Sequence, residues 1–486
     1  MTGRLTAVGA LSAALIAAGL AMAPAPAAAQ AGFVCVDETT GDGQGATAGG
    51  SDNNVACGPD ADASGDDGNT AIGANANASG TASGNTATGF GADAHGNNSF
   101  NTVFGENSIA SGDLSRNIAV GRVANASGDN SINIATGLAA DARGDGSRNI
   151  ATGSSANASG AGSSNVAVGD QADAHGSFSF NNASGSHANA SGVGSSNVAT
   201  GQSADASGDA SVNNASGFLA NASGAGSSNI ATGNIADASG TGSSNNGIGF
   251  NANASGDGSN NLAIGRNSAA SGDGTNNMAI GFGASASNSS IAIGAGAVAT
   301  GSVAVGNGSF ASNGGAAFGD LAAATGTNST AIGPNASATH ANSAAFGNGA
   351  TTTRDSQQAF GTASNTYTMA GIGSQASRDA QMGPTYFVTS DGSGNLATTS
   401  FDLGGFQNQL GELGDGVAMA MALGGAILPA GKNFAVTSNV GHFNGSSALG
   451  IAAIGKITDN VYLNAGGAIG FQTNSYGGRA GVTVAW

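Results

Sequence analysis

Histidine and aspartate are the residues here whose spacing could support chemistry, because both bind metal ions and exchange protons. His95 and His175 occupy equivalent positions in Ala-His-Gly. One position of a sequence repeat alternates between aspartate and asparagine, and its acids are Asp93, Asp141, Asp173, Asp205 and Asp237. In an assembly of three chains, each histidine could form a ring that holds an ion, and the acids could hold cations. Solvated surface residues are the favoured interpretation, because the calcium-solenoid pattern Gly-Gly-x-Gly-x-Asp is absent.

The sequence indicates no catalytic site, no cofactor-binding site and no metal site. The chain has 86 glycines, so matches to Gly-x-Gly-x-x-Gly are expected by chance, and none follows a strand in a βαβ unit. An enzyme built on a repeat fold would need clustered carboxylates, whereas these acids are periodic. We therefore predict a protein that is not an enzyme and that needs no cofactor.

Cys35 and Cys57 are the only cysteines. Two nearby cysteines in an exported chain favour a disulfide that closes a loop of about 20 residues. The alternative is a free, packed Cys57, because this residue lies in Asn-Val-Ala-Cys-Gly, an early copy of the repeat. A disulfide here would hold the first coil, which no further coil covers.

The first residues are typical of an export signal, with Arg4 before an apolar segment and Ala27-Ala28-Ala29 before Gln30. The 486-residue chain has a formal net charge of -18 and only 8% charged residues. This balance disfavours nucleic acid as a partner and provides no basic membrane-binding patch.

A sequence repeat predicts the structural elements that carry these residues. Asn-x-Ala-x-Gly recurs every 16 residues, with its asparagine running from Asn69 to Asn277, and the period then shortens to 12–14 residues. A fixed short period is the signature of a solenoid. Each repeat has two extended pieces, and we expect small residues inside the coil and bulky ones facing a neighbouring chain. Asn182 and Asn214 replace the aliphatic residue, and the repeated asparagines could form ladders in which each amide bonds the next.

The C-terminal region has a different pattern. A heptad seam is formed by Leu403, Phe406, Leu410, Leu413 and Val417. Residues from Lys432 to Trp486 then predict four strands of about ten residues, which is the length of a tilted membrane-spanning strand. Four strands leave two open edges that hydrocarbon does not tolerate. Several chains must therefore share one barrel, whose small-residue inner face leaves room for the heptad segments.

The whole arrangement resembles the trimeric autotransporter adhesins of Gram-negative outer membranes. The resemblance is carried by head repeats such as Asn165–Gly169, the neck-like segment Ala363–Ile372, the segment from Val388 to Thr398, the anchor-like Gly416–Leu423, and strands that close on Trp486. It implies a homotrimer, a left-handed parallel β-roll head and a twelve-stranded barrel with four strands per chain. It also implies insertion by the outer-membrane barrel machinery, self-assisted export, and a head displayed on the cell surface. The implied partners are host receptors, extracellular matrix or sister cells.

The sequence differs from the family pattern in its repeat of 16 residues, where 14 is usual, and in its very short stalk. We predict an all-β chain divided into a signal peptide (1–29), a tip with the cysteine pair (30–58), a β-roll head (59–350), a neck (351–402), a short coiled-coil or plug helix (403–430) and anchor strands (431–486). The predicted function is adhesion or autoaggregation, with virulence as its expected context. The alternative is a structural or ice-binding surface rod, which is suggested by a recurring but interrupted threonine position: Thr88, Thr136, Thr152, Thr200 and Thr232.

Overall fold

The computed structural model describes residues 32–35, 42–50, 53–383, 385–400 and 402–486. The predicted signal peptide, residues 1–29, lies outside these ranges. The chain forms two compact units, one within residues 1–365 and the other within residues 366–486. Each unit is described by itself.

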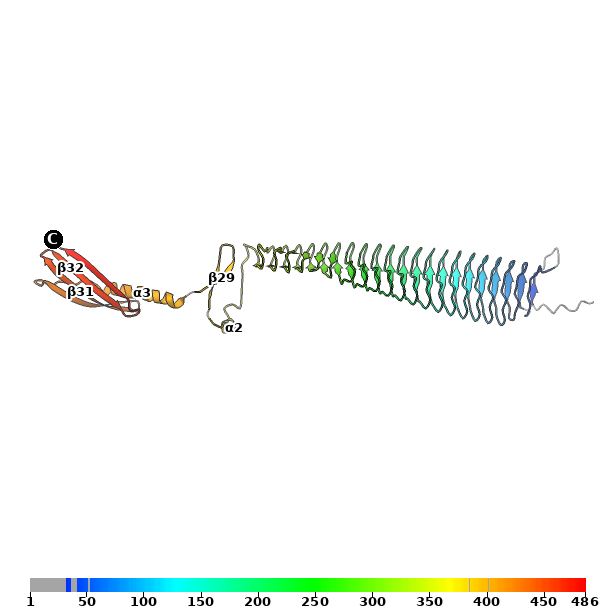
Figure 1. The fold of residues 1–486 in the computed structure, drawn as a ribbon, viewed down its shortest axis with the longest axis horizontal. Helices are drawn as coiled ribbons and strands as arrows, with labels where there is room; N and C mark the ends of the chain where they lie inside the picture. Colours follow the sequence, from blue (N-terminus) through cyan, green and yellow to red (C-terminus); the bar gives the residue numbers. More distant parts are fainter. Residues whose placement is uncertain (1–31, 36–41, 51–52, 384, 401) are drawn as a thin grey trace, which may run out of the picture. The chain divides into compact units, whose positions relative to one another are not determined.

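The first unit is a stack of short parallel strands in a 22-stranded sheet (Figure 1). Each strand pairs in register with the equivalent strand of the next coil, as β6 does with β7. The strands are β1 (Phe33–Val34), β2 (Val55–Cys57), β3 (Thr70–Ile72), β4 (Thr86–Thr88), β5 (Thr102–Phe104), β6 (Ile118–Val120), β7 (Ile134–Thr136), β8 (Ile150–Thr152), β9 (Val166–Val168), β10 (Asn182–Ser184), β11 (Val198–Thr200), β12 (Asn214–Ser216), β13 (Ile230–Thr232), β14 (Asn246–Ile248), β15 (Leu262–Ile264), β16 (Met278–Ile280), β18 (Ile291–Ile293), β20 (Val303–Val305), β22 (Ala316–Phe318), β24 (Thr330–Ile332), β26 (Ala344–Phe346) and β27 (Gln358–Phe360). The last of these strands lies beyond residue 350, where the sequence predicts that the head ends.

The second side of each coil changes along the stack. In the 16-residue repeats it is held by isolated parallel bridges, such as Asn125 with Asp141, and not by the full strand that the alternating pattern predicts. In the shorter repeats it becomes a five-stranded sheet of β17 (Ser285–Ser287), β19 (Val298–Thr300), β21 (Phe310–Ser312), β23 (Ala323–Ala324) and β25 (Ser337–Ala338). The longer turn of the 16-residue repeat therefore accompanies less regular pairing on this side.

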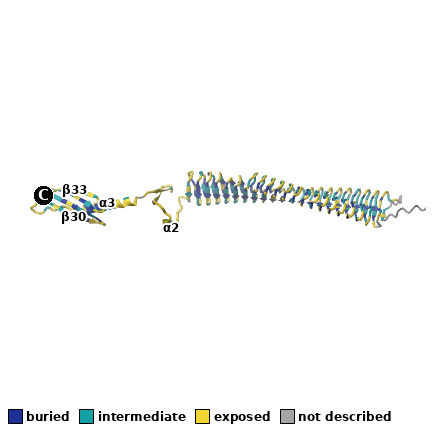
Figure 2. Ribbon diagram, turned by 60° about the horizontal axis from the view of Figure 1, so that its bottom comes forward, coloured by how far each residue is buried: buried dark blue, intermediate teal, exposed yellow. Residues whose placement is uncertain are grey.

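The core of the stack consists of small residues, as the sequence predicts. The middle residue of each three-residue strand points inward, and Ala119, Ala135 and Ala151 are completely buried there. Figure 2 shows buried residues running along the stack. The closing glycine permits this close spacing of coils. Gly169 has φ +140°, and a Cβ there would overlap the backbone carbonyl of Gly185 in the next coil.

The second unit contains α2 (Gln375–Asp379) and an antiparallel hairpin of β28 (Phe387–Ser390) and β29 (Leu396–Thr399). After these come α3 (Leu403–Ala422) and a four-stranded antiparallel sheet of β30 (Phe434–Phe443), β31 (Ser446–Thr458), β32 (Val461–Gly470) and β33 (Tyr476–Val484). The predicted all-β architecture, with a solenoid followed by a C-terminal four-stranded sheet, is confirmed. Among the described helices, none combines the length and the apolar character needed to cross a membrane.

Candidate functional site

A column of buried asparagines fixes the path of each coil. Asn149 Nδ2 donates to the carbonyl oxygens of Arg143 (3.3 Å) and Gly160 (2.9 Å). Its Oδ1 accepts from the backbone N–H of Asn165 (3.0 Å) and from Ser163 Oγ (3.0 Å). One side chain therefore satisfies backbone groups of its own coil and of the next coil, which a buried backbone requires.

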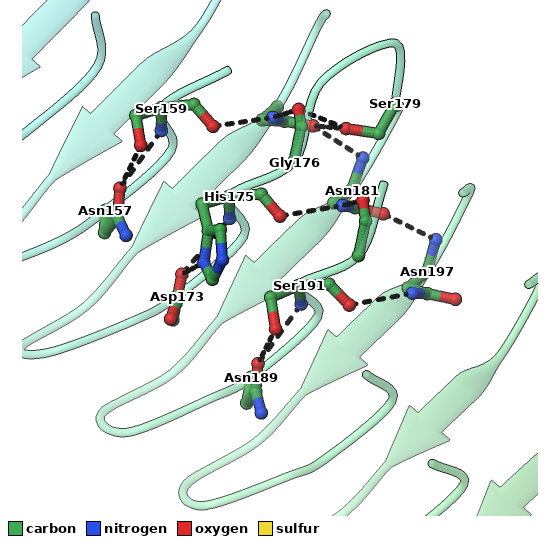
Figure 3. Close-up of polar contacts among 12 residues, drawn as sticks. Asn157, Ser159, Asp173, His175, Gly176, Ser179, Asn181, Asn189, Ser191 and Asn197 are labelled. Carbon is green, nitrogen blue, oxygen red and sulfur yellow. Dashed lines mark hydrogen bonds and ion pairs between the residues drawn. The ribbon is translucent and has the colours of Figure 1, made fainter. Parts of the chain in front are cut away.

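The same arrangement recurs at Asn181 and Asn197 (Figure 3). Asn181 Oδ1 accepts from the backbone N–H of Asn197 at 3.1 Å, and Asn181 Nδ2 donates to the His175 carbonyl at 3.2 Å. The predicted ladder, in which each asparagine side chain bonds the side chain above it, is therefore wrong. The asparagine side chains bond backbone groups instead. The column is structural, because its side-chain polar atoms bond the backbone within each coil and between successive coils.

The outer face of the 22-stranded sheet carries the bulky side chains. Ile118 and Val120 flank the buried Ala119, and both side chains are exposed on the single chain. Stacked coils extend this face in two columns, with Ile134 and Ile150 following Ile118 in register. An extended exposed apolar surface of this kind is typical of an interaction face.

Three coils interrupt the apolar column with asparagine. Asn182 and Asn214 flank Val198 in the register of the sheet, and Asn246 lies one coil beyond Ile230. Polar and aliphatic residues therefore alternate over these five strands. The sequence prediction named the first two positions and missed Asn246.

The threonine column lies on this same outer face. Thr136 and Thr152 pair in register, but Val120 precedes them and Val168 follows them. A flat, continuous threonine surface, which the ice-binding alternative would use, is therefore broken within the 16-residue repeats.

The alternating aspartates and asparagines close local turns on the opposite side of the coil. Asn157 Oδ1 accepts from both the N–H and the hydroxyl of Ser159, at 3.1 and 2.7 Å (Figure 3). Asp173 lies 2.6 Å from His175 Nδ1. The hydrogen bond with this carboxylate raises the pKa of His175 above its ordinary value of 6.5, although partial burial opposes the rise.

Asp93 has the same effect on His95, again first through the side-chain hydrogen bond, so the pKa of His95 is also raised. Within the described ranges, no group of three or more histidine, cysteine or acidic side chains is arranged to hold a metal ion. The paired geometry gives each histidine a carboxylate partner in its own chain.

A second acidic column was missed by the sequence prediction. Asp113 Oδ1 accepts from the backbone N–H of Asn97 (2.7 Å), and Asp129 Oδ1 accepts from that of Asp113 (2.8 Å). Asp145 continues the series by accepting from Asp129 at 2.9 Å. These carboxylates line a shallow open groove together with His95. The recurrence of acids every 16 residues, at Asp113, Asp129 and Asp145, was the available signal.

At the N-terminal end of the stack, β1 pairs with β2 in parallel. The structure joins Cys35 and Cys57 by a disulfide across 22 residues of sequence. The bond links the segment just after β1 to the last residue of β2. It therefore holds the first coil of the described stack closed.

In the second unit, α3 packs on the sheet through its small residues. Ala418 and Ala422 are buried, and a Cβ at Gly441 of β30 would overlap the Ala418 carbonyl and the Ala422 amide. The heptad residues lie elsewhere on the helix, and four of them are exposed on the single chain: Leu403, Phe406, Leu410 and Leu413. Val417 is partly buried. The two faces of α3 therefore separate sheet contact from the heptad seam.

Asp415 is a buried acid of α3 that the sequence prediction did not identify. Its Oδ2 accepts from the backbone N–H and the hydroxyl of Thr473, at 2.7 and 2.9 Å, in the segment after β32. Charge-assisted bonds of this kind are stronger than neutral ones. They fix the helix to the end of the sheet. Trp486, the predicted barrel terminus, is fully exposed on the single chain.

Comparison with protein families gives matches in both parts of the chain. A YadA head domain repeat matches residues 118–132 and 324–350, and a YadA-like membrane anchor domain matches residues 428–486. No curated protein matches the chain. The first match falls on the solenoid coils, and the second covers the four-stranded sheet.

Together these two matches are the signature of the trimeric autotransporter adhesins, and they confirm the resemblance found in the sequence. A YadA-like anchor means attachment to the outer membrane, with the head displayed on the cell surface. The family is a structural adhesin family and implies a homotrimer.

Proposed function

We propose that this chain is a surface adhesin that assembles as a homotrimer, exports its own head through a shared barrel, and binds host surfaces, matrix or sister cells. The observation that carries the proposal is the presence of YadA-type head and anchor matches in one chain. A chain with both parts can display a long repetitive surface outside the cell without a separate anchor protein.

Two features of the single chain support assembly with further copies. The outer face of the head exposes aliphatic side chains such as Ile118 and Val120, whose burial would release about 25 cal/mol per Å² of apolar area. In the anchor, β30 pairs only with β31 and β33 only with β32 among the described strands. Membrane-spanning sheets close all their edges, so neighbouring copies are the simplest partners for both surfaces.

The positions of the heptad residues support the same assembly. Leu403, Phe406 and Leu410 point away from the contacts that α3 makes with its own sheet, because the buried residues of the helix are Asp415, Ala418, Met419 and Ala422. Seams of this kind pair with equivalent seams on sister helices. We propose that residues 403–430 fill the shared barrel, while residues 431–486 form its wall.

The experiment that tests this proposal compares cells that express the full chain with cells that express a chain lacking residues 403–486. The full chain should migrate as a trimer on unboiled gels, label with an antibody at the cell surface, and increase cell settling or matrix attachment. The truncated chain should do none of these. A heat-resistant band of monomer size, or surface display of the truncated chain, would contradict the assembly and anchor assignments.

Adhesion itself needs its own control. Cells should carry equal surface amounts of the full chain and of a variant that lacks residues 59–350 but keeps the anchor. Only the cells that display the head should attach to matrix and settle faster. If both strains attach equally at equal display, the head is not the adhesive part.

A further inference from the structure

One edge of the head carries a regular row of aromatic and polar side chains. The row occupies the second position after each of five consecutive strands, β12 to β16, and consists of Phe218, Asn234, Phe250, Arg266 and Phe282. We call this row the aromatic ridge. Aromatic residues therefore alternate with hydrogen-bond donors from coil to coil.

The backbone of the ridge is held in register by hydrogen bonds between coils. The Phe218 carbonyl accepts from Ile235 N–H at 2.8 Å, and the Phe250 carbonyl accepts from Asn267 N–H at 2.9 Å. Stacked strands lie about 4.8 Å apart, so phenylalanines on alternate coils are about 10 Å apart. The ridge therefore presents one phenylalanine ring at every second coil, at a fixed spacing along the stack.

Arg266 is fixed between two of these rings. Its guanidinium carbon lies 5.5 Å from the centre of the Phe250 ring and 5.9 Å from the centre of the Phe282 ring. Cation–π contacts at this distance orient the planar group. The guanidinium keeps N–H donors at its edge, which suits hydrogen bonding to oxygen atoms that pass along the ridge.

The rings are exposed on the single chain, by 42% at Phe218, 45% at Phe250 and 57% at Phe282. Three exposed aromatic rings in one row on a water-facing surface suggest an interaction site.

The charge of the chain restricts which class of partner can bind there. Arg266 is the only arginine or lysine between Arg148 and Arg354, and the chain carries a net charge of -18. A polyanion would be repelled, whereas an uncharged polyhydroxyl chain would not.

We propose that the aromatic ridge binds an uncharged, extended, β-linked polysaccharide. An extended β-linked chain presents the same ring face at every second sugar, a repeat close to the spacing of the phenylalanines, about 10 Å. Sugar rings lie against the exposed parts of Phe218, Phe250 and Phe282 that Arg266 leaves uncovered, while Asn234 and Arg266 donate to hydroxyl oxygens between them. This proposal rests on the proposed adhesive function and assigns it a ligand class.

The test uses the full-length protein in detergent and calorimetric titration with three oligosaccharides. Cellohexaose is β-linked, extended and neutral; maltohexaose is α-linked and curved; a hyaluronan hexasaccharide is extended but acidic. Cellohexaose should bind, maltohexaose should give no binding heat, and the acidic oligosaccharide should bind more weakly than cellohexaose. Absence of cellohexaose binding, equal binding of maltohexaose, or tighter binding of the acidic oligosaccharide would each overturn the proposal.

Variants localise the site. Phe250→Ala and Phe282→Ala should each lower cellohexaose affinity about tenfold, because each removes an exposed aromatic contact surface and one of the rings that orient Arg266. Arg266→Gln should lower the affinity less. The matched control is Phe90→Ala: Phe90 occupies the same turn position after β4, but Arg122 occupies the position two coils further on. Its affinity should equal that of the unaltered protein, and a tenfold loss in this control would refute the ridge as the site.

Unboiled gels of the same variants separate binding from assembly. The ridge variants should keep the same oligomeric band and the same surface display as the unaltered protein. If they instead lose the oligomer, the rings pack between subunits and the ligand assignment is wrong. If the unaltered protein and all variants assemble and adhere but the unaltered protein does not bind cellohexaose, the polysaccharide inference fails while the adhesin proposal stands.

Discussion

The head and the anchor are incomplete in different ways. In the head, β6 has parallel partners on both sides, so its backbone is satisfied within one chain, and what remains uncovered is the apolar face with Ile118 and Val120. In the anchor, the side chains facing α3 are covered, but β30 and β33 end the four-stranded sheet with one partner each. A strand inside the head therefore leaves only side chains uncovered, whereas the two edge strands of the anchor leave backbone groups uncovered in addition to exposed side chains.

This difference indicates which part of the chain depends more strongly on association with other copies. An exposed apolar side chain in water costs about 1.5–3 kcal/mol relative to its buried state. Unpaired backbone groups in hydrocarbon cost several kcal/mol each, and a strand edge carries many of them. We therefore expect the anchor to require its partners strictly and the head to tolerate local defects.

Gly441→Val should have the largest effect, because it separates α3 from its sheet. A Cβ at position 441 would overlap the Ala418 carbonyl and the Ala422 amide, which are helix backbone atoms that cannot rotate away. We expect loss of the oligomer on unboiled gels and loss of surface display. The control is Gly467→Val, because a Cβ at position 467 has only the Gly477 carbonyl oxygen near it, at 3.9 Å. Normal assembly of Gly441→Val would show that the helix does not sit against this sheet.

A glycine of the head should give a smaller and more local effect. A Cβ at Gly217 would overlap the Gly233 carbonyl of the next coil, and Gly217 has φ +143°. Gly217→Ala should lower the free energy of local opening by about 3 kcal/mol or more, through both steric overlap and backbone strain. Hydrogen exchange of the neighbouring coils in the full-length protein measures this opening.

Gly226→Ala is the matched control in the same coil region, because a Cβ there has no heavy atom within 4 Å. It retains only the cost of placing alanine at φ +62°, about 1 kcal/mol. Equal protection losses in the two variants would mean that the close approach between coils is not what requires glycine. Coils far from the substitution should keep their protection, since solenoid stability is transmitted between neighbours.

The repeat made the coil predictable, but not the partners of its polar atoms. Sixteen-residue spacing of Asn-x-Ala-x-Gly is enough to place Ala119 inside and Ile118 outside, because strand side chains alternate. The bond from Asn149 to the Gly160 carbonyl depends on how the chain turns over eleven residues, and no local pattern specifies that path.

The same limit applies to the other parts of the candidate site. The heptad seam was visible in the sequence as spacing, but the face of α3 that meets the sheet depends on glycines from distant strands, such as Gly441 and Gly450. Asp415 was missed for this reason, because its partner Thr473 lies 58 residues away. The aromatic ridge becomes visible only when successive turns are superposed, so its residues were not singled out by local motifs.

Asn149→Ala tests the internal hydrogen bonds of the head. It removes the donor to Gly160 and leaves the Asn165 N–H without its 3.0 Å acceptor in the coil interior. The expected loss of local stability is about 2–3 kcal/mol. Asn157→Ala is the control at the partly exposed turn, where the Asn157 side chain bonds Ser159, and it should cost about 1 kcal/mol or less. Hydrogen exchange of the flanking strands distinguishes them, and equal losses would contradict the structural role of the buried column.

The smallest effect should be a dependence of head stability on pH at His175. Its pKa is raised above 6.5, first by the hydrogen bond with Asp173, so the folded state binds a proton more tightly than the unfolded state. The resulting stability is fully present below pH 6.5 and is lost as the pH rises through the raised pKa. Because the His175–Asp173 pair is half-exposed, this pH-dependent contribution to stability should be only a few tenths of a kcal/mol.

His175→Gln should therefore lower the melting temperature of the head at pH 5.5 and have no such effect at pH 8.5. The comparison is His187→Gln, because His187 Nδ1 faces the Ser186 hydroxyl at 2.8 Å and not a carboxylate. His187→Gln should change the melting temperature by the same amount at pH 5.5 and at pH 8.5. A larger loss for His175→Gln at pH 8.5 than at pH 5.5 would reverse the sign and would mean that the neutral imidazole, and not the ion pair with Asp173, stabilises this coil.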